Sequence, residues 1–467
     1  MMKKDTVIVD TGIIPFNFVK ECVEKSLYDI VFLGGFEKKE SYEKVFNNNV
    51  YYSYNDLDRD VISDGVDISD CYNDIYNRVI SDYKTLQIVE RSDERRILPI
   101  KPWENVFNDL IIVSKLVANA LCLLKKYNPK FIFFQATPHE THTWVFAKCA
   151  EEMGITVYYA NLALLPWKAS LNSGLNEIKI VSFNKNSNIK ADFESVERFF
   201  ALNTSSYEKA IPSYEKKRLS KRKKVWSWTK QFKSNLRKPK YFIGLLRKYK
   251  IYKLYERLST TNLNDDKFVV VFLHYQPERT SCPEGKFFSQ QYHLIKTISM
   301  SLPEGYYVYV KEHPSMFLND FDIRFRNRDF YESIARLPNV KIVNINIDSF
   351  SLLDKSICIA TITGTVGIQS MMRGKGVLCF GDAYYKNSRY CFEISDAEDI
   401  RKALNILEEK DSKEISRHFL SEMHESDNLS ISGVLNEGGD IDDFYNQEYR
   451  LNSNGLLLET LLTMPTK

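Results

Sequence analysis

The loop that follows the apolar run 131–136 carries three ionisable side chains, His139, Glu140 and His142. A carboxylate or imidazole at such a place could take the proton of a hydroxyl group, and crowded ionisable groups shift one another's pKa values. The two histidines are three residues apart, which does not match the H-E-x-x-H zinc motif. We interpret Glu140 as a candidate general base, with His139 as its substitute. The alternative is that Glu140 caps the next helix and the histidines bond to the backbone.

A second group lies where the apolar run 306–310 ends, with Lys311, His313 and Pro314 in the sequence KEHP. An imidazole at the carboxyl end of a strand can donate a hydrogen bond to a phosphate or, once protonated, place a positive charge beside it. The proline delays the start of any following helix. A lone histidine is more often a core residue than a ligand, so this pair alone is weak evidence for a site.

A third group is the segment 360–382, in which a predicted strand leads into Thr363, Gly364 and Thr365, then a helix, then another strand. Hydroxyl groups and backbone N–H groups at the start of a helix favour an anion such as a nucleotide phosphate. The segment matches neither the P-loop nor G-x-G-x-x-G. A plain turn before a helix is the alternative.

A turn after the apolar run 268–275 adds Gln276 and Glu278, which follow a predicted strand directly. Polar side chains at this place can line a ligand site, although a surface turn would look the same. Alone, this signal is weak.

Short apolar runs rich in Val, Ile, Phe and Tyr must position these residues. Unbroken apolar character is typical of strands buried on both faces, and the helix-length segments between the runs predict parallel α/β sheets. Ligands of such sheets bind at the carboxyl ends of the strands. The predicted strands are 6–10, 29–35, 131–136 and 156–161 in the first half, and 268–275, 306–314, 340–344, 357–363 and 377–382 in the second.

Length and composition bound the function. The 467 residues are enough for two large domains, and 44% hydrophobic with 27% charged residues exclude a wholly disordered chain. A net charge of +3 gives no global attraction to nucleic acid. The eight cysteines form no C-x-x-C pair, so we expect reduced core residues. We find no signal peptide or membrane-spanning run, and expect a cytoplasmic protein.

The stretch 216–253 differs from the rest, because it contains sixteen Lys or Arg residues, no acidic residue and interleaved aromatic residues. One interpretation is a solvated linker helix. The other is a surface that docks on anionic phospholipid, with the aromatic rings at the headgroup level. We do not expect nucleic-acid binding, since no recognised nucleic-acid module accompanies the stretch.

The His313-Pro314 pair, followed fifty residues later by a strand, the Thr363-Gly364-Thr365 turn, a helix and a strand, resembles the donor half of GT-B glycosyltransferases. More narrowly, it resembles the capsule polysaccharide biosynthesis family and the related bacterial sialyltransferases, polysialyltransferases and Kdo transferases. The resemblance covers residues 268–382 well and the first half more loosely. In those families the pair and the later turn hold the cytidine monophosphate of a CMP-sugar.

The resemblance implies an inverting, metal-independent glycosyltransferase with two Rossmann-like domains facing a cleft. The donor would be a CMP-sugar, either Kdo or a nonulosonic (sialic-type) acid, and the product a capsule, lipopolysaccharide or other surface polysaccharide. The implied acceptor is a glycan or lipid-linked glycan, and no cofactor or metal is expected. Relatives often carry Glu where Gln369 stands, which weakens the expected ribose contact. The implied donor-binding residues are Lys311, His313, Pro314, Thr363, Gly364, Thr365, Gln369, Gln276 and Glu278, while Glu140, His139 and His313 would be catalytic.

The predicted organisation is an acceptor-side domain over 1–212, a basic linker or helical segment over 213–261 and a donor domain over 262–440. The segment 441–467 would pack back on the first domain.

Three alternatives stay open: a CDP-glycerol or CDP-ribitol phosphotransferase, a non-catalytic component of a glycan assembly complex and, less favoured because of Gln369, a UDP-N-acetylglucosamine 2-epimerase. The basic stretch would hold the protein at the inner face of the cytoplasmic membrane.

Overall fold

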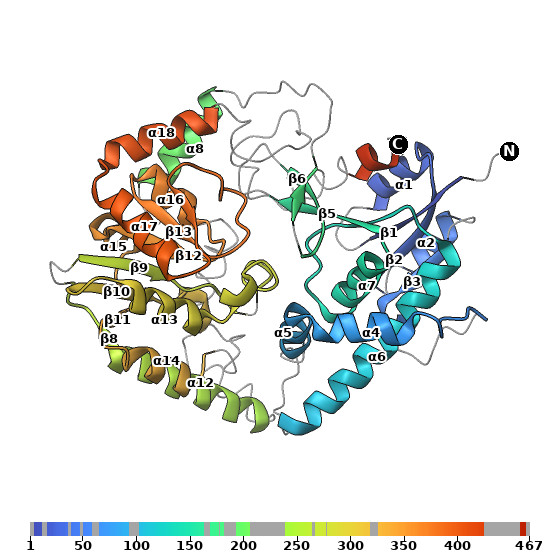
Figure 1. Cartoon of the computed structure of the whole chain (residues 1–467), viewed down its shortest axis with the longest axis horizontal. Helices are drawn as coiled ribbons and strands as arrows, with labels where there is room; N and C mark the ends of the chain where they lie inside the picture. The colour runs from blue at the N-terminus through green and yellow to red at the C-terminus, as the bar shows by residue number, and fades with distance from the viewer. Residues whose placement is uncertain are drawn as a thin grey trace. The chain divides into compact units, whose positions relative to one another are not determined.

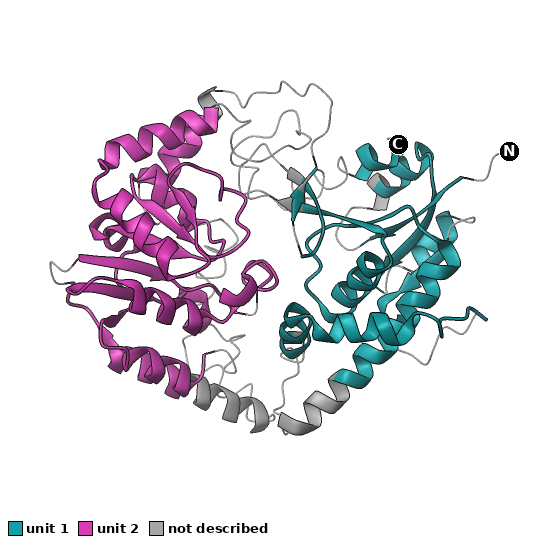
Figure 2. Ribbon diagram, in the orientation of Figure 1, with its two compact units in different colours: residues 1–189, 431–467 teal, residues 190–430 magenta. Residues whose placement is uncertain are grey.

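The computed structural model divides the chain into two compact units, which Figure 2 colours separately: residues 1–189 with 431–467, and residues 190–430. Each unit is built on its own seven-stranded sheet. The structure describes residues 4–11, 16–35, 39–46, 50–57, 65–92, 102–162, 169–176, 178–181, 193–205, 239–263, 267–276, 278–317, 326–424 and 458–463.

The sheet of unit 1 has the order β3-β2-β1-β4-β5-β6-β7. The first five strands in this order are parallel, and β6 and β7 extend the sheet as antiparallel strands. Four of the five parallel strands are the predicted ones. The strands are β1 (Thr6–Asp10), β2 (Asp29–Gly34), β3 (Val50–Ser53), β4 (Phe131–Phe134), β5 (Thr156–Leu162), β6 (Ala169–Ser173) and β7 (Lys179–Ile180).

Within the described ranges of unit 1, these strands are connected by the following helices (Figure 1): α1 (Phe16–Glu24), α2 (Lys39–Val45), α3 (Tyr54–Leu57), α4 (Tyr72–Ser81), α5 (Tyr83–Ser92), α6 (Pro102–Tyr127) and α7 (Thr141–Glu152). The C-terminal residues 458–463 also belong to this unit, beside α1. Leu458, Leu461 and Leu462 pack in the core with Val7 and Val9 of β1. The N–H of Leu27 bonds to the carbonyl of Leu462 at 3.0 Å. The end of the chain therefore packs on unit 1.

The sheet of unit 2 is parallel throughout and has the order β14-β13-β12-β9-β10-β11-β8. Both its faces are covered, so the middle residues of its central strands are apolar. The strands are β8 (Ser259–Thr260), β9 (Lys267–Phe272), β10 (Tyr306–Lys311), β11 (Val340–Val343), β12 (Cys358–Thr361), β13 (Gly376–Cys379) and β14 (Cys391–Glu393).

Side chains alternate between the two faces of this sheet. Val269, Val271, Val308 and Val310 face one core, to which α12, α13, α14, α17 and α18 contribute. The helices are α8 (Phe193–Ser205), α12 (Pro239–Leu258), α13 (Gln291–Ser301), α14 (Arg328–Ala335), α15 (Ser349–Lys355), α16 (Val366–Met372), α17 (Ala397–Glu408) and α18 (Ser412–His424), with 3₁₀ turns η3 (Lys286–Ser289) and η4 (Pro314–Phe317).

This architecture confirms the predicted α/β class with two Rossmann-like domains. The predicted boundaries at residues 212 and 262 differ from the observed division. The reason is packing, because Tyr255 of α12 is buried in the core of unit 2 and β8 pairs with β11 of that unit's sheet. The part of the basic stretch that is described, 239–253, is therefore part of unit 2, while 216–238 lies outside the described residues.

No helix among the described residues is long and apolar enough to span a membrane.

Candidate functional site

The carboxyl edge of the unit 2 sheet has a topological switch point at β9. The chain passes from β9 to β10 on one side, whereas β12 lies on the other side. Ligands of open parallel sheets bind at such a point, just beyond the strand ends. The segments that follow these three strands are 273–276, 312–314 and 362–365. All three contain residues that the sequence nominated.

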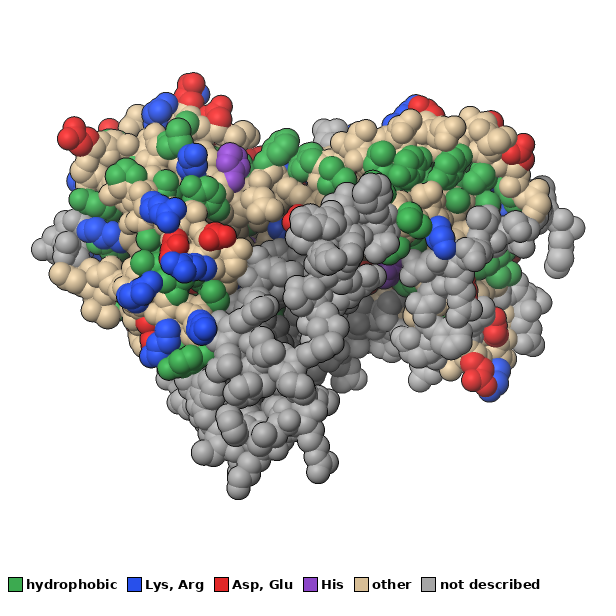
Figure 3. Space-filling model, turned by 90° about the horizontal axis from the view of Figure 1, so that it is seen from below, with side chains coloured by type: hydrophobic (Ala, Val, Ile, Leu, Met, Phe, Trp, Pro, Cys, Tyr) green, Lys and Arg blue, Asp and Glu red, His purple; other side chains and the backbone are tan. Residues whose placement is uncertain are grey.

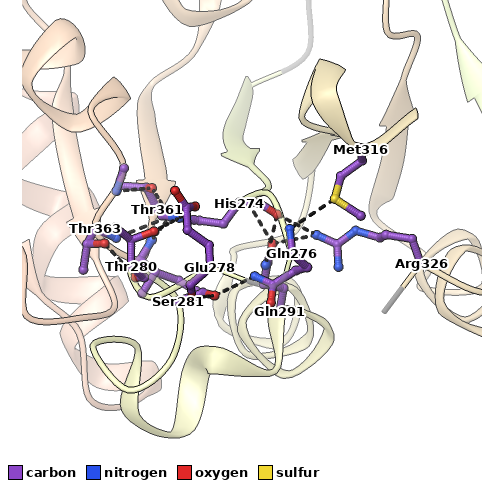
Figure 4. Close-up of polar contacts among 12 residues, drawn as sticks. His274, Gln276, Glu278, Thr280, Ser281, Gln291, Met316, Arg326, Thr361 and Thr363 are labelled. Carbon is purple, nitrogen blue, oxygen red and sulfur yellow. Dashed lines mark hydrogen bonds and ion pairs between the residues drawn. The ribbon is translucent and has the colours of Figure 1, made fainter. Parts of the chain in front are cut away.

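His274, which follows β9, joins two of these segments (Figure 4). Its side chain is almost fully buried. The ring Nε2 lies 3.0 Å from Oγ1 of Thr361 and accepts the backbone N–H of Ile362 at 3.2 Å and that of Thr363 at 3.4 Å. Because Nε2 is an acceptor, the neutral ring carries its proton on Nδ1.

The Nδ1 side of the His274 ring faces the loop 276–281. Oγ1 of Thr280 lies 3.4 Å from Nδ1, and a carboxylate oxygen of Glu278 lies 3.8 Å from it. Desolvation acts to raise the pKa of the Glu278 carboxyl, but hydrogen bonds from His274 and Thr280 and the charge of nearby His313 outweigh it, so this pKa lies below its ordinary value. Glu278 is therefore a carboxylate at neutral pH, at the place where the sequence predicted a ligand contact.

The turn after β12 is fixed by internal hydrogen bonds. The Thr363 hydroxyl donates to the carbonyl of Thr280 at 2.7 Å, and the N–H of Gly364 bonds to Oγ1 of Thr361 at 3.2 Å. A Cβ on Gly364 would lie 2.7 Å from that oxygen and 3.4 Å from the His274 ring, so only glycine fits without a shift.

In this structure these donors of Thr363 and Gly364 are used within the protein, and their role toward a phosphate stays a prediction. Thr365 differs, since its hydroxyl and backbone N–H make no hydrogen bond to the described part of the chain. Of the three predicted turn residues, Thr365 is the one with donors to offer.

His313, which follows β10, lies beside the same loop. Its Nδ1 accepts the N–H of Ser315 at 3.2 Å, so the neutral ring carries its proton on Nε2. The His313 ring meets Tyr275 edge to face, with ring centroids 6.2 Å apart. Pro314 begins η4. The structure thus brings His313, Glu278 and His274 into one neighbourhood.

Three other predicted donor-site residues are engaged elsewhere. The Lys311 ammonium is buried and donates to the carbonyl of Ile345 at 3.1 Å, and burial lowers its pKa to about 8. The Gln276 amide is also buried and donates to Oγ of Ser281 at 2.7 Å. The Gln369 amide donates to Asn203 of α8 at 3.3 Å.

In these contacts the polar groups of Lys311 and Gln276 bond to the protein's own backbone and loop, and their role at the donor site stays a prediction. For Gln369 the amide N–H is directed to α8, and the amide oxygen makes no hydrogen bond to the described residues. The sequence reasoning also missed His274, because it counted this residue as part of a strand over 268–275. The strand ends at Phe272. A histidine near the end of an apolar run was the available signal, as it was for His313.

A second cluster lies at the switch point of the unit 1 sheet, where β1 is flanked by β2 and β4. Asp10, the last residue of β1, is mostly buried and accepts the Tyr54 hydroxyl at 2.7 Å. The Tyr54 ring packs on the His142 ring at 4.2 Å, and Nε2 of His142 lies 3.2 Å from a carboxylate oxygen of Glu140. Burial and the charges of Asp10 and Glu140 raise the pKa of Tyr54 well above its ordinary value.

The two predicted bases of this cluster have different surroundings. Nδ1 of His139 lies 2.8 Å from the carbonyl of Thr137, which matches the alternative that this histidine bonds to the backbone. Glu140 stands at the N-terminus of α7 and its carboxylate meets His142. The sequence reasoning missed Asp10 and Tyr54, although an acid at the end of the first strand was a signal for Asp10.

No cluster of three or more His, Cys, Asp or Glu side chains that could hold a metal ion occurs within the described ranges.

Comparison with known proteins finds a match to one family model over part of the chain. Residues 192–390 match the family model described as "Capsule polysaccharide biosynthesis protein". This range falls inside unit 2 and contains the His274 and His313 segments. The predicted resemblance to this family is therefore confirmed over these residues. Protein FixF of Sinorhizobium fredii is 30% identical over 129 residues, which are 28% of this chain and 29% of that protein.

Several solved structures match at lower identity. UDP-GlcNAc 2-epimerase from Methanocaldococcus jannaschii is 13% identical, with 88% of this chain and 97% of that chain covered and a TM-score of 0.24. KpsC, a β-Kdo 2,7 transferase from Thermosulfurimonas dismutans, is 11% identical, with 61% and 79% covered and a TM-score of 0.26. HepE from Anabaena, in complex with UDP-glucose, is 9% identical, with 99% and 100% covered and a TM-score of 0.30.

Proposed function

We propose that this chain is a glycosyltransferase of capsule or other surface polysaccharide synthesis that takes its sugar from a nucleotide-activated donor. The family match over residues 192–390 supports the role in capsule synthesis. The observation that carries the proposal is the meeting of His274, His313 and the 361–365 turn at the switch point of the unit 2 sheet. This is where an open parallel sheet binds its ligand.

In this proposal the donor phosphate binds beside His313 and Thr365. The Nε2–H of His313 and the hydroxyl and N–H of Thr365 are the donors directed to it. Negative charge grows on the phosphate as the sugar leaves, and fixed donors stabilise that charge most strongly in a site shielded from water. His274 holds the turn that carries Thr365, and the carboxylate of Glu278 accepts hydrogen bonds from hydroxyl groups of the sugar donor.

We further propose that the donor is a CMP-sugar, with Kdo or a nonulosonic acid as the sugar. The His313-Pro314 pair and the hydroxyl-bearing turn, which the capsule family's relatives use for cytidine monophosphate, support this choice. The test is calorimetric titration of the purified chain with CMP, CDP, UDP and GDP, followed by turnover of the matching nucleotide sugars. We expect CMP to bind most tightly and CMP to be released from a CMP-sugar only when an acceptor is present. Tighter binding of UDP or GDP than of CMP would contradict the proposal that the donor is a CMP-sugar.

We assign the acceptor side of the reaction to unit 1. The Glu140 carboxylate, held by His142 at 3.2 Å, takes the proton of the acceptor hydroxyl. The acceptor oxygen then forms a bond to the anomeric carbon while the bond from that carbon to the phosphate oxygen breaks, so CMP leaves with the electron pair. One displacement of this kind inverts the anomeric centre.

A CDP-glycerol or CDP-ribitol phosphotransferase would also release CMP, so released nucleotide alone does not separate the two reactions. Presenting CMP-sugars and CDP-alditols in parallel does. The proposal expects transfer from the first class and none from the second.

We also propose that the basic stretch 216–253 holds the protein on an anionic membrane surface, at the inner face of the cytoplasmic membrane. Its described end supports this, because Tyr249, Lys250 and Lys253 line a surface pocket of about 640 Å³ together with Arg257 and Arg328. Figure 3 shows basic side chains, with acidic ones between them, gathered on this flank of unit 2. An apolar floor with a cationic rim suits an anionic headgroup.

A further inference from the structure

An ion pair is buried behind the histidines of unit 2. Nε of Arg326 lies 2.5 Å from Oε2 of Glu312, and both residues are at most 2% exposed. Glu312 follows β10 and directly precedes His313 in the sequence. Arg326 lies just before α14.

The Arg326 side of this pair holds the backbone of His274. Nη2 of Arg326 donates to the carbonyl of His274 at 3.0 Å and to Oε1 of Gln291 at 3.1 Å (Figure 4). The same Gln291 oxygen accepts the N–H of His274 at 2.9 Å, and the Gln291 amide donates to the His274 carbonyl at 3.3 Å. Both backbone groups of His274 are therefore fixed by Arg326 and its neighbour Gln291.

The Glu312 side holds the backbone of His313. Oε1 of Glu312 accepts the N–H of His313 at 2.8 Å, while Oε2 accepts the Tyr331 hydroxyl at 2.8 Å in addition to Arg326. One carboxylate thus fixes the start of the His313 segment. Through Arg326 the same carboxylate is linked to the His274 segment.

A buried ion pair is often no more stabilising than apolar side chains at the same position, because the cost of removing two charges from water can exceed their attraction. Apolar side chains of similar volume often stabilise such a site as well. The directional bonds of this pair, however, reach the two backbone segments that carry His274 and His313. An apolar pair could not supply them.

We propose that Arg326 and Glu312 are positioning residues of the donor site, which set the backbones of His274 and His313 relative to each other. This inference rests on the proposed function of unit 2, and it gives the ion pair a role separate from stability.

The test replaces the buried group by apolar side chains, with Arg326→Met, Glu312→Leu and Tyr331→Phe combined so that the tyrosine hydroxyl does not lose its acceptor. The control is Lys402→Met with Glu398→Leu, which removes an exposed ion pair of 2.7 Å from α17. Thermal unfolding, hydrogen exchange by mass spectrometry and calorimetric binding of CMP are measured on the full chain.

In the triple variant we expect amide exchange to speed up about tenfold or more in residues 272–276 and 312–316, with the centres of β9 and β10 unchanged. We expect the Kd for CMP to rise about tenfold or more, and the control to change neither. A folded triple variant with unchanged exchange in both segments overturns the proposal. If the wild-type chain binds no nucleotide, the proposed function fails, while the exchange measurement still decides the positioning role.

Arg326→Lys covers the case in which the triple variant does not fold. A lysine keeps a positive charge opposite Glu312 but lacks the planar fork that reaches Glu312, Gln291 and the His274 carbonyl together. We expect faster exchange in 272–276 and unchanged exchange in 312–316. If this variant shows the same change in amide exchange in both segments, or no change in either, the proposal is contradicted.

Discussion

Nε2 of His274 lies 3.0 Å from Oγ1 of Thr361, although 87 residues separate them in the chain. The contact joins the ends of β9 and β12, the two strands at the switch point of the unit 2 sheet. It also holds the turn 361–365, because the same imidazole nitrogen accepts the backbone N–H groups of Ile362 and Thr363.

Replacing His274 should therefore disturb the donor site without touching the donor. In His274→Ala the N–H groups of Ile362 and Thr363 lose their acceptor, and a buried unsatisfied donor costs about 1–3 kcal/mol. We expect the Kd for CMP to rise about tenfold, with partial recovery in His274→Gln, whose amide oxygen can accept. Calorimetry measures both. His293→Ala, at an exposed position on α13, is the control and should bind as the wild type does. If His274→Ala binds CMP with the same affinity as the wild type, the turn that His274 holds does not contribute to the donor site.

His313→Ala should reduce turnover more than any other single change in unit 2. The variant loses the Nε2–H donor that we assign to the developing phosphate charge, and the loss of one such donor costs about 10²–10³ in kcat. Steady-state release of CMP from a CMP-sugar measures the effect. Full turnover with every nucleotide sugar tried would show that the donor assignment is wrong.

Glu140→Gln should lower kcat about 10²-fold or more while leaving the Kd for CMP unchanged. The amide keeps the shape of the side chain but cannot take the acceptor proton. Glu151→Gln, later on the same helix α7, is a matched control because Glu151 pairs with Lys148. Equal losses in kcat and in donor affinity would reassign Glu140 to binding.

Lys311 should make the stability of unit 2 depend on pH. Burial lowers the pKa of Lys311 from 10.5 to about 8 in the folded state, so the charged form is disfavoured by folding. Below pH 8 both states are protonated and the full cost is present, whereas between pH 8 and 10.5 the unfolded state binds more protons and stability rises with pH.

The check is urea unfolding of the wild type and Lys311→Met at several values from pH 7 to 10.5. We expect the free energy of unfolding of the wild type, relative to the variant, to rise by up to about 3 kcal/mol across this window. Other ionisable groups cancel in the difference. A difference independent of pH would mean that the Lys311 ammonium is solvated in the folded protein.

Charge reversal on α12 should weaken binding to anionic membranes. Lys250→Glu, Lys253→Glu and Arg257→Glu together remove three cations from α12, two in the described end of the basic stretch and one just beyond it. Each cation near such a surface contributes about 1 kcal/mol. Sedimentation with vesicles that contain phosphatidylserine should show a loss of about tenfold or more, and less binding at higher salt. Reversal of Arg401, Lys402 and Lys413 on the same unit is the control. Equal loss in both variants would indicate attraction by total charge alone.

Much of the fold could be predicted from local pattern. The run 6–10 coincides with β1, whose central residues Val7, Ile8 and Val9 are buried, because a strand covered on both faces is apolar at its centre. The strands that the sequence did not reveal are short or polar, such as β8 (Ser259–Thr260) and β6 with the sequence ASLNS. These strands form by hydrogen bonding to a neighbouring strand, so their own residues give little indication that they are strands.

The site was predicted less completely, and the reason is again physical. That His313, Glu278 and Thr365 follow strands of one parallel sheet is a consequence of chain order, so the sequence by itself determined that they gather at one edge. Which polar group bonds to which is decided by distances across that edge. Only the tertiary structure could show that the donors of Thr363 and Gly364 end within the protein. Likewise, only the tertiary structure could show that the Lys311 ammonium donates to the carbonyl of Ile345, because the two groups are far apart in the chain.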